Sequence, residues 1–204
     1  MLRPRDKKII QALHLFRCIS RDQIAKLFFS NVKNPITAAN YVLKRLRREN
    51  HIDANVDTQP YIYFPKPSTI KKNSQKTKHY LAIVDFYIDV CKYECPAIFE
   101  VEKRYGSGYA QPDIYMVWQG KVYFVEIQLS RYSSDLIEEK LNRYENYLKS
   151  EKYFCKKITS NINDSPYIWI VSKTPYAILN SNLKVIQTSN VDKIFSDNEI
   201  LNYK

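Results

Sequence analysis

The positive charge of this chain lies almost entirely in its first 78 residues. Residues 1–78 contain 17 Lys and Arg against 5 Asp and Glu, a net charge of +12, whereas residues 79–204 contain 15 against 16. The segment at residues 65–78 has two prolines, five lysines and few apolar side chains, which is typical of a linker. We therefore predict two modules, residues 1–64 and 79–204, joined by a basic linker at residues 65–78.

The composition excludes several classes of protein. The 204 residues include only three glycines, so glycine-rich phosphate loops are excluded by count. No apolar run approaches the roughly 20 residues that a membrane-spanning helix needs, and the charged start MLRPRDKKIIQ does not resemble a secretory signal. The four cysteines lack zinc-site spacing. We expect a cytoplasmic protein with no membrane partner.

Residues 1–64 show the pattern of three helices followed by a β-hairpin. Helices are expected at residues 4–18, from Ser20 onward and at residues 35–50, because apolar residues recur at helical spacing. Ser20 and Gln23 form a capping-box pattern at the start of the second helix. Two short apolar segments, residues 51–54 and 61–64, then flank a polar turn. Three helices and a hairpin predict a winged helix-turn-helix.

The third helix has a polar and basic face opposite its apolar stripe. Such a face fits the major groove of double-stranded DNA, with N-terminal residues near base edges, cations near phosphates and the hairpin against the backbone. A solvated basic helix in a protein–protein adaptor is the alternative. The predicted DNA-binding residues are Thr37, Asn40, Tyr41, Lys44, Arg45, Arg47 and Arg48.

Residues 79–204 predict a mixed α/β (α+β) domain. The apolar patterns indicate, in order, a helix, three strands, an amphipathic helix beginning at Ser133 or Ser134, and a buried strand. A further strand is expected at residues 183–188, in a tail to which we assign no function. The expected ranges are 79–94, 97–105, 113–118, 121–129, 133–154 and 167–172.

A tight turn at Gln119-Gly120 brings two carboxylates together. If Trp118 lies opposite Lys121, then Asp113 lies directly opposite Glu126. Like charges at that position repel unless a divalent cation lies between them.

Three further residues are predicted to lie near this acidic pair. Gln128 shares the strand face of Glu126. Glu100 would oppose Asp113 if Gly106-Ser107 closes the preceding hairpin, and it would then be a third candidate ligand of the metal. Lys140 shares a helix face with Leu136 and Tyr144, which should look back toward the sheet.

These residues, in this order of elements, carry a resemblance to known families. Pro112-Asp113 and Glu126-Ile127-Gln128 in an αβββαβ order resemble the PD-(D/E)xK nuclease superfamily, whose fold is that of restriction endonucleases. With the winged helix, VEIQLS and EEKLNRYENY, the layout resembles the replication-relaxation family of plasmid and other mobile-element proteins.

The resemblance implies a metal-dependent DNA endonuclease or nickase. Asp113 and Glu126 would hold Mg²⁺ or Mn²⁺, and Gln128 would position water. The superfamily usually has lysine at the position of Gln128, and Lys140 on the next helix is the candidate substitute.

The resemblance also implies replication or relaxation proteins of the same element as partners, and a homodimer is left open. One alternative function is a non-catalytic replication or relaxation factor that uses the nuclease fold for docking. Another is a transcription regulator with a sensing domain.

Overall fold

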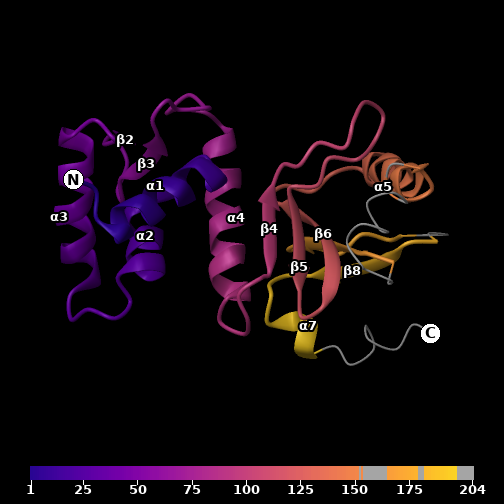
Figure 1. The fold of residues 1–204 in the computed structure, drawn as a ribbon. Helices are drawn as coiled ribbons and strands as arrows, with labels where there is room; N and C mark the ends of the chain where they lie inside the picture. Colours follow the sequence, from indigo (N-terminus) through magenta and orange to yellow (C-terminus); the bar gives the residue numbers. More distant parts are fainter. Residues whose placement is uncertain (152, 154–164, 179–181, 197–204) are drawn as a thin grey trace. The chain divides into compact units, whose positions relative to one another are not determined.

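The chain forms two compact units, residues 1–88 and 89–204 (Figure 1). The computed structural model describes residues 1–151, 153, 165–178 and 182–196. In these residues it contains six helices and two sheets, so it is a mixed α/β protein compatible with the α+β class. The division between the units differs from the predicted one, because most of the helix expected to open the second module belongs to the first unit.

Three helices begin the first unit: α1 (Pro4–Phe16), α2 (Arg21–Phe28) and α3 (Pro35–Arg48). Proline suits the first turn of α1 and α3 because that turn leaves N–H groups without helical partners. At α2 the Ser20 hydroxyl accepts from the Gln23 N–H (3.3 Å) and the Gln23 amide accepts from the Ser20 N–H (3.1 Å), as the capping-box pattern predicted. The helices bury Ile9, Leu13, Phe16, Ile24, Ala39, Leu43 and Leu46.

A three-stranded antiparallel sheet completes this helical part of the unit. The strands are β1 (Ile19–Ser20), β2 (Ile52–Asn55) and β3 (Ile62–Pro65), in the order β1-β3-β2. The expected hairpin is therefore present, with each strand beginning one residue later than predicted.

Residues 65–78 do not act as a free linker between modules. The Lys72 ammonium lies 2.9 Å from the Asp53 carboxylate on β2, and α4 (Lys76–Val90) begins inside the segment. On α4, the carbonyl of Leu81 and the carboxylate of Asp85 each accept a hydrogen bond from the Gln23 amide at 2.8 Å. These contacts join the segment and the following helix to the first unit.

The second unit contains a five-stranded sheet in the order β4-β5-β6-β7-β8. The first three strands are antiparallel, and β6, β7 and β8 are parallel. Each strand lies within one residue of a predicted range or inside it. The strands are β4 (Ile98–Val101), β5 (Ile114–Trp118), β6 (Lys121–Gln128), β7 (Tyr167–Ser172) and β8 (Lys184–Thr188).

Both faces of this sheet carry apolar side chains. Helix α5 (Ser134–Leu148) lies against one face (Figure 1), where Tyr144 and Tyr147 are at most 2% exposed. The other face carries Trp118 and Trp169, whose ring centroids are 6.1 Å apart, and Trp118 also contacts Phe195 of α7 (Lys193–Ser196). Side chains of α5 therefore point at the face that carries Glu126.

Candidate functional site

Asp113 and Glu126 lie side by side where β5 begins and β6 ends. The hairpin pairs Trp118 with Lys121 and Ile114 with Val125, which is the predicted register. Asp113 directly precedes β5, and its carboxylate accepts a hydrogen bond from the Ile127 N–H at 2.8 Å. Its position next to Glu126 follows from this register and this hydrogen bond.

Glu126 is almost completely buried, and its two oxygens have different partners. The side chain is 2% exposed. The Lys140 ammonium donates to Oε2 and the Tyr144 hydroxyl donates to Oε1. Lys140 and Tyr144 are four residues apart on α5, so both point from the same side of the helix.

Burial and the second carboxylate, that of Asp113, raise the free energy of a negative charge on Glu126. Burial, followed by the charge of Asp113, raises the pKa of Glu126 to about 8, although Lys140 and Tyr144 act in the opposite direction. Burial alone would lower the pKa of Lys140, but Glu126 and Asp113 raise it and the net shift is upward. Burial and Glu126 also hold the pKa of Tyr144 well above its ordinary value. Lys140 is therefore an ammonium donor at neutral pH.

A small cavity adjoins this cluster. Its volume is about 10 Å³, close to the space that one water molecule needs. The Gln128 amide makes no hydrogen bond to any residue that the structure describes, so its polar atoms are available to a bound water or ion. The cavity is lined by Glu126, Gln128, Ile137, Lys140, Leu141, Tyr144, Ile168 and Ile170.

The donors at this site fit a hard divalent cation. Two carboxylates and a glutamine amide offer the oxygen ligands that Mg²⁺ and Mn²⁺ prefer. Each Glu126 oxygen that accepts one hydrogen bond keeps a lone pair for a second partner. The described residues contain no cluster of three or more His, Cys, Asp or Glu side chains suited to a metal, so water or phosphate oxygens would complete the coordination.

The predicted position of Glu100 is wrong. Glu100 pairs with Tyr115 rather than with Asp113, and its carboxylate forms an ion pair with Lys103. Glu102 takes the position next to Asp113, where its N–H donates to the Asp113 carbonyl at 2.9 Å. The connection between β4 and β5 is a long loop rather than a tight Gly106-Ser107 turn, which shifts the register by two residues and keeps Glu100 on the expected face.

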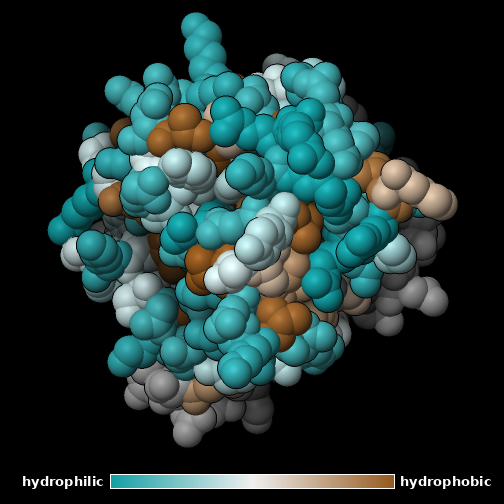
Figure 2. Space-filling model, turned by 90° about the vertical axis from the view of Figure 1, so that its left-hand side faces the viewer, coloured by the Kyte–Doolittle hydropathy of each residue, from teal (hydrophilic) through white to brown (hydrophobic). Residues whose placement is uncertain are grey.

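Six of the seven predicted DNA-binding residues are exposed on α3. Figure 2 views the molecule from the side on which α3 lies in Figure 1, and hydrophilic residues make up most of that side. Tyr41 is 75% exposed. The exposed six are Thr37, Asn40, Tyr41, Lys44, Arg47 and Arg48.

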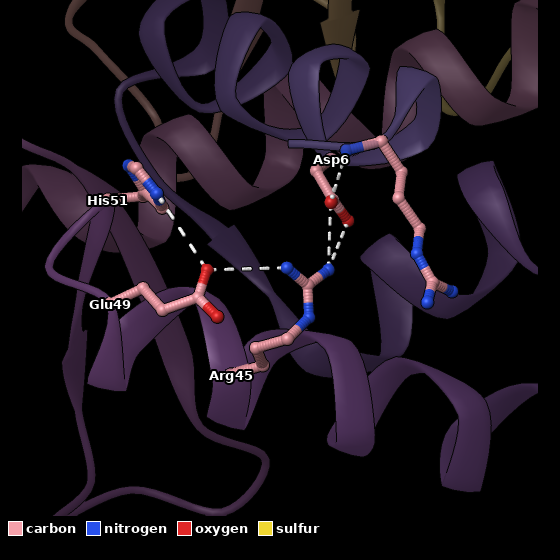
Figure 3. Close-up of polar contacts among 5 residues, drawn as sticks. Asp6, Arg45, Glu49 and His51 are labelled. Atoms are coloured by element: carbon pink, nitrogen blue, oxygen red, sulfur yellow. Dashed lines mark hydrogen bonds and ion pairs between the residues drawn. The ribbon is translucent and has the colours of Figure 1, made fainter. Parts of the chain in front are cut away.

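Arg45 has a different environment (Figure 3). Its Nη2 lies 2.8 Å from both carboxylate oxygens of Asp6 on α1, and its Nη1 lies 3.3 Å from Glu49, whose carboxylate is also 3.8 Å from His51. Asp6 is 1% exposed. Arg45 thus joins α3 to α1 instead of extending toward a ligand.

Two residues that contact predicted site residues were not themselves predicted from the sequence: Tyr144, beside Glu126, and Asp6, beside Arg45. Tyr144 was placed on the Lys140 face of its helix but not assigned to the site, and the spacing from Lys140 was the available signal. Asp6 carried only the signal of an acid in the first turn of a helix.

Comparisons with known proteins identify no relative. No family model matches the chain, and no curated protein or solved structure is significantly similar to it. Among the described residues, no helix is both long and apolar enough to cross a membrane.

Proposed function

We propose that this chain binds duplex DNA with residues 1–88 and hydrolyses a phosphodiester bond at the Asp113–Glu126 site with Mg²⁺ or Mn²⁺. The observation that carries the proposal is the approach of Lys140 to Glu126. The motif lacks its usual lysine because Gln128 occupies that position, and Lys140 supplies a cation beside the acidic pair from α5. The carboxylates of Asp113 and Glu126, the ammonium of Lys140 and a small cavity beside Glu126 and Lys140 then lie close together.

The first unit supplies the DNA-binding part of the proposal. Its first three helices and its three-stranded sheet have the composition of a winged helix, with β2 and β3 as the wing. The exposed face of α3 and the net charge of +12 in residues 1–78 match the electrostatic pattern of a DNA-binding module.

The residues of the second unit have distinct roles in the proposed reaction. Asp113 and Glu126 would hold the cation, and Glu126 and Gln128 both line the adjoining cavity. When bound, the cation polarises the phosphate and lowers the pKa of a water. Lys140 donates one N–H to Glu126 and keeps two for a phosphate oxygen, where its charge stabilises the developing negative charge. Tyr144 fixes the Glu126 carboxylate.

The test is cleavage of supercoiled, linear and single-stranded DNA with Mg²⁺, Mn²⁺ or EDTA. We expect metal-dependent nicking or cutting that Asp113→Asn and Glu126→Gln abolish, while both variants bind DNA as the wild type does. Glu138→Gln, at an exposed carboxylate of α5, is the matched control and should retain activity. Absence of cleavage by the wild type with either metal would overturn the enzymatic proposal.

A non-catalytic factor is the second candidate. Both oxygens of Glu126 already accept hydrogen bonds, so the cluster also forms a satisfied buried network without a metal. This candidate predicts DNA binding that survives EDTA and no cleavage of any substrate. Either function is compatible with replication, relaxation or transcriptional control of a mobile element, with other proteins of that element as partners.

A further inference from the structure

The exposed face of α3 changes chemical character along its length. Thr37, Tyr41, Lys44 and Arg48 follow one another at spacings of four, three and four, which places them in one row on the outside of the helix. All four are exposed. The N-terminal half of this row is neutral, whereas the C-terminal half is cationic.

The neutral half contains neither arginine nor lysine, the side chains that most often read guanine. Arg and Lys read guanine through its O6 and N7 atoms, and residues 35–43 include neither. Lys44, the next such residue, belongs to the cationic half of the row, and Asp6 holds the guanidinium of Arg45 at 2.8 Å. Arg47 is exposed in the C-terminal half of α3, outside residues 35–43, and its charge acts on the phenol of Tyr63 on β3.

The same half offers the groups that read adenine and thymine. Asn40 is exposed beside the row, and an asparagine amide pairs with N6 and N7 of adenine. Ile36 is 39% exposed one residue before Thr37, and both side chains present methyl groups of the kind that contacts the C5 methyl of thymine.

We infer that the N-terminal half of α3 reads A·T base pairs in the major groove, while Lys44 and Arg48 hold the flanking phosphates. This inference rests on the proposed binding of duplex DNA by the first unit and does not depend on catalysis. Helix-turn-helix proteins contact base edges with the N-terminal residues of the recognition helix, which is where Ile36, Thr37 and Asn40 lie. The positive charge of residues 1–78 favours a polyanion over a protein partner.

The first experiment is selection of bound duplexes from a random library by the full-length protein, in EDTA and at one fixed salt concentration. EDTA prevents metal-dependent cleavage, so the result is independent of the nuclease proposal. We expect the selected duplexes to share a short run of A·T pairs. A shared G·C run, or strong binding with no shared sequence, would overturn the inference and leave the DNA-binding proposal intact. Failure to bind any duplex would overturn both.

The second experiment assigns the contacts in the selected duplex. Replacing thymine by deoxyuracil removes one methyl group and should weaken wild-type binding about fourfold at the contacted position. Replacing adenine by 7-deazaadenine removes the N7 acceptor, and Asn40→Ala should become insensitive to it.

Variants of the methyl-bearing residues complete the test. Thr37→Ser keeps the hydroxyl and loses only the methyl, and Ile36→Ala shortens the apolar side chain. At least one of them should no longer respond to deoxyuracil. Arg48→Ala is the control, which should bind more weakly but respond as the wild type does. If both methyl variants also respond as the wild type does, the contact lies elsewhere and the inference is wrong.

Discussion

Two buried carboxylates in this protein have the same kind of partner and opposite pKa shifts. Asp6 is paired with Arg45 and Glu126 with Lys140, each cation coming from a helix. Burial opposes the charge of Asp6, but Arg45 and the Arg3 N–H, at 2.8 Å, hold the pKa of Asp6 below its ordinary value. At Glu126 the second carboxylate of Asp113 adds to burial, and the pKa is about 8. At Glu126, burial and the charge of Asp113 together outweigh Lys140 and Tyr144, whereas at Asp6 the contacts with Arg45 and Arg3 outweigh burial.

The lowered pKa of Asp6 makes the first unit sensitive to acid. Its folded pKa lies below the unfolded one, so its contribution to stability is present above about pH 4 and is lost as the pH falls through the folded pKa. Asp6→Asn should lower the free energy of unfolding at neutral pH by about 1–3 kcal/mol, because a charge-assisted hydrogen-bond pair is lost. It should also flatten the dependence below pH 4. Urea unfolding at several pH values measures both effects, and an unchanged acid dependence would contradict the assignment.

The raised pKa of Glu126 has the opposite consequence. Its folded pKa lies above the unfolded one, so stability from this group is lost as the pH rises from about 4 toward 8. Lys140→Met removes the compensating cation and raises this pKa further. The loss of stability should therefore be larger at about pH 9 than at about pH 6, reaching about 3 kcal/mol or more at the higher pH.

The double variant Lys140→Met/Glu126→Gln is the control for this prediction. It removes the ionisable carboxyl group as well as the lysine, so its stability relative to Glu126→Gln should change little between these pH values. Urea denaturation at both pH values distinguishes the variants. Equal destabilisation by Lys140→Met at both would show that Lys140 does not compensate Glu126.

At the scale of elements, one side of α3 contacts α1 and another side is exposed to solvent. Arg45 joins it to α1, whereas Lys44 and Arg48 remain on the exposed side. Glu49 and His51 extend the contact toward the start of β2 (Figure 3). The orientation of the exposed row therefore depends on a charge pair that does not itself face a ligand.

Two arginine variants of α3 separate binding from positioning. Arg48→Ala should leave the melting temperature unchanged, weaken duplex binding for all sequences and reduce the slope of log K against log salt by about 0.9, since one phosphate contact is lost. Arg45→Ala should instead lower the melting temperature, because the buried Asp6 loses its partner. Binding titrations at several salt concentrations and thermal unfolding measure the two. If Arg45→Ala instead behaves as Arg48→Ala does, with an unchanged melting temperature and weaker duplex binding, Arg45 contacts DNA.

At the scale of the whole molecule, charge and structure divide the chain at different places. The charge asymmetry ends at residue 78, whereas the structural division falls between residues 88 and 89. The difference is α4, which provides two hydrogen-bond acceptors for Gln23 and the Tyr87 ring, 5.3 Å from that of Phe16. The first unit thus includes most of a helix that begins inside the basic segment and continues beyond it.

Truncation measures this requirement. A fragment of residues 1–92 should unfold cooperatively, whereas residues 1–64 should not, because the buried Gln23 amide and Phe16 would lose their partners on α4. Circular dichroism during heating distinguishes the outcomes. Cooperative unfolding of residues 1–64 would show that α4 is dispensable and would restore the boundary predicted from charge.

Much of the local structure was predictable because its causes are local. The alternation of apolar residues and the Gln119-Gly120 turn predicted the β5–β6 register, and that register placed Asp113 beside Glu126. The Ser20–Gln23 cap and the strand at residues 167–172 were also predicted correctly. The pairing of Glu100 was not, because the loop between β4 and β5 does not contain a tight turn that would fix a register.

The sequence by itself determined the elements, the acidic pair and the concentration of positive charge, since each depends on spacing along a few neighbouring residues. Only the tertiary structure decided which cation meets which carboxylate. Lys140 lies 14 residues from Glu126, and Arg45 lies 39 residues from Asp6. Such pairs depend on how helices pack against a sheet or against each other, and the sequence pattern records which face of a helix is buried but not which residue it is buried against.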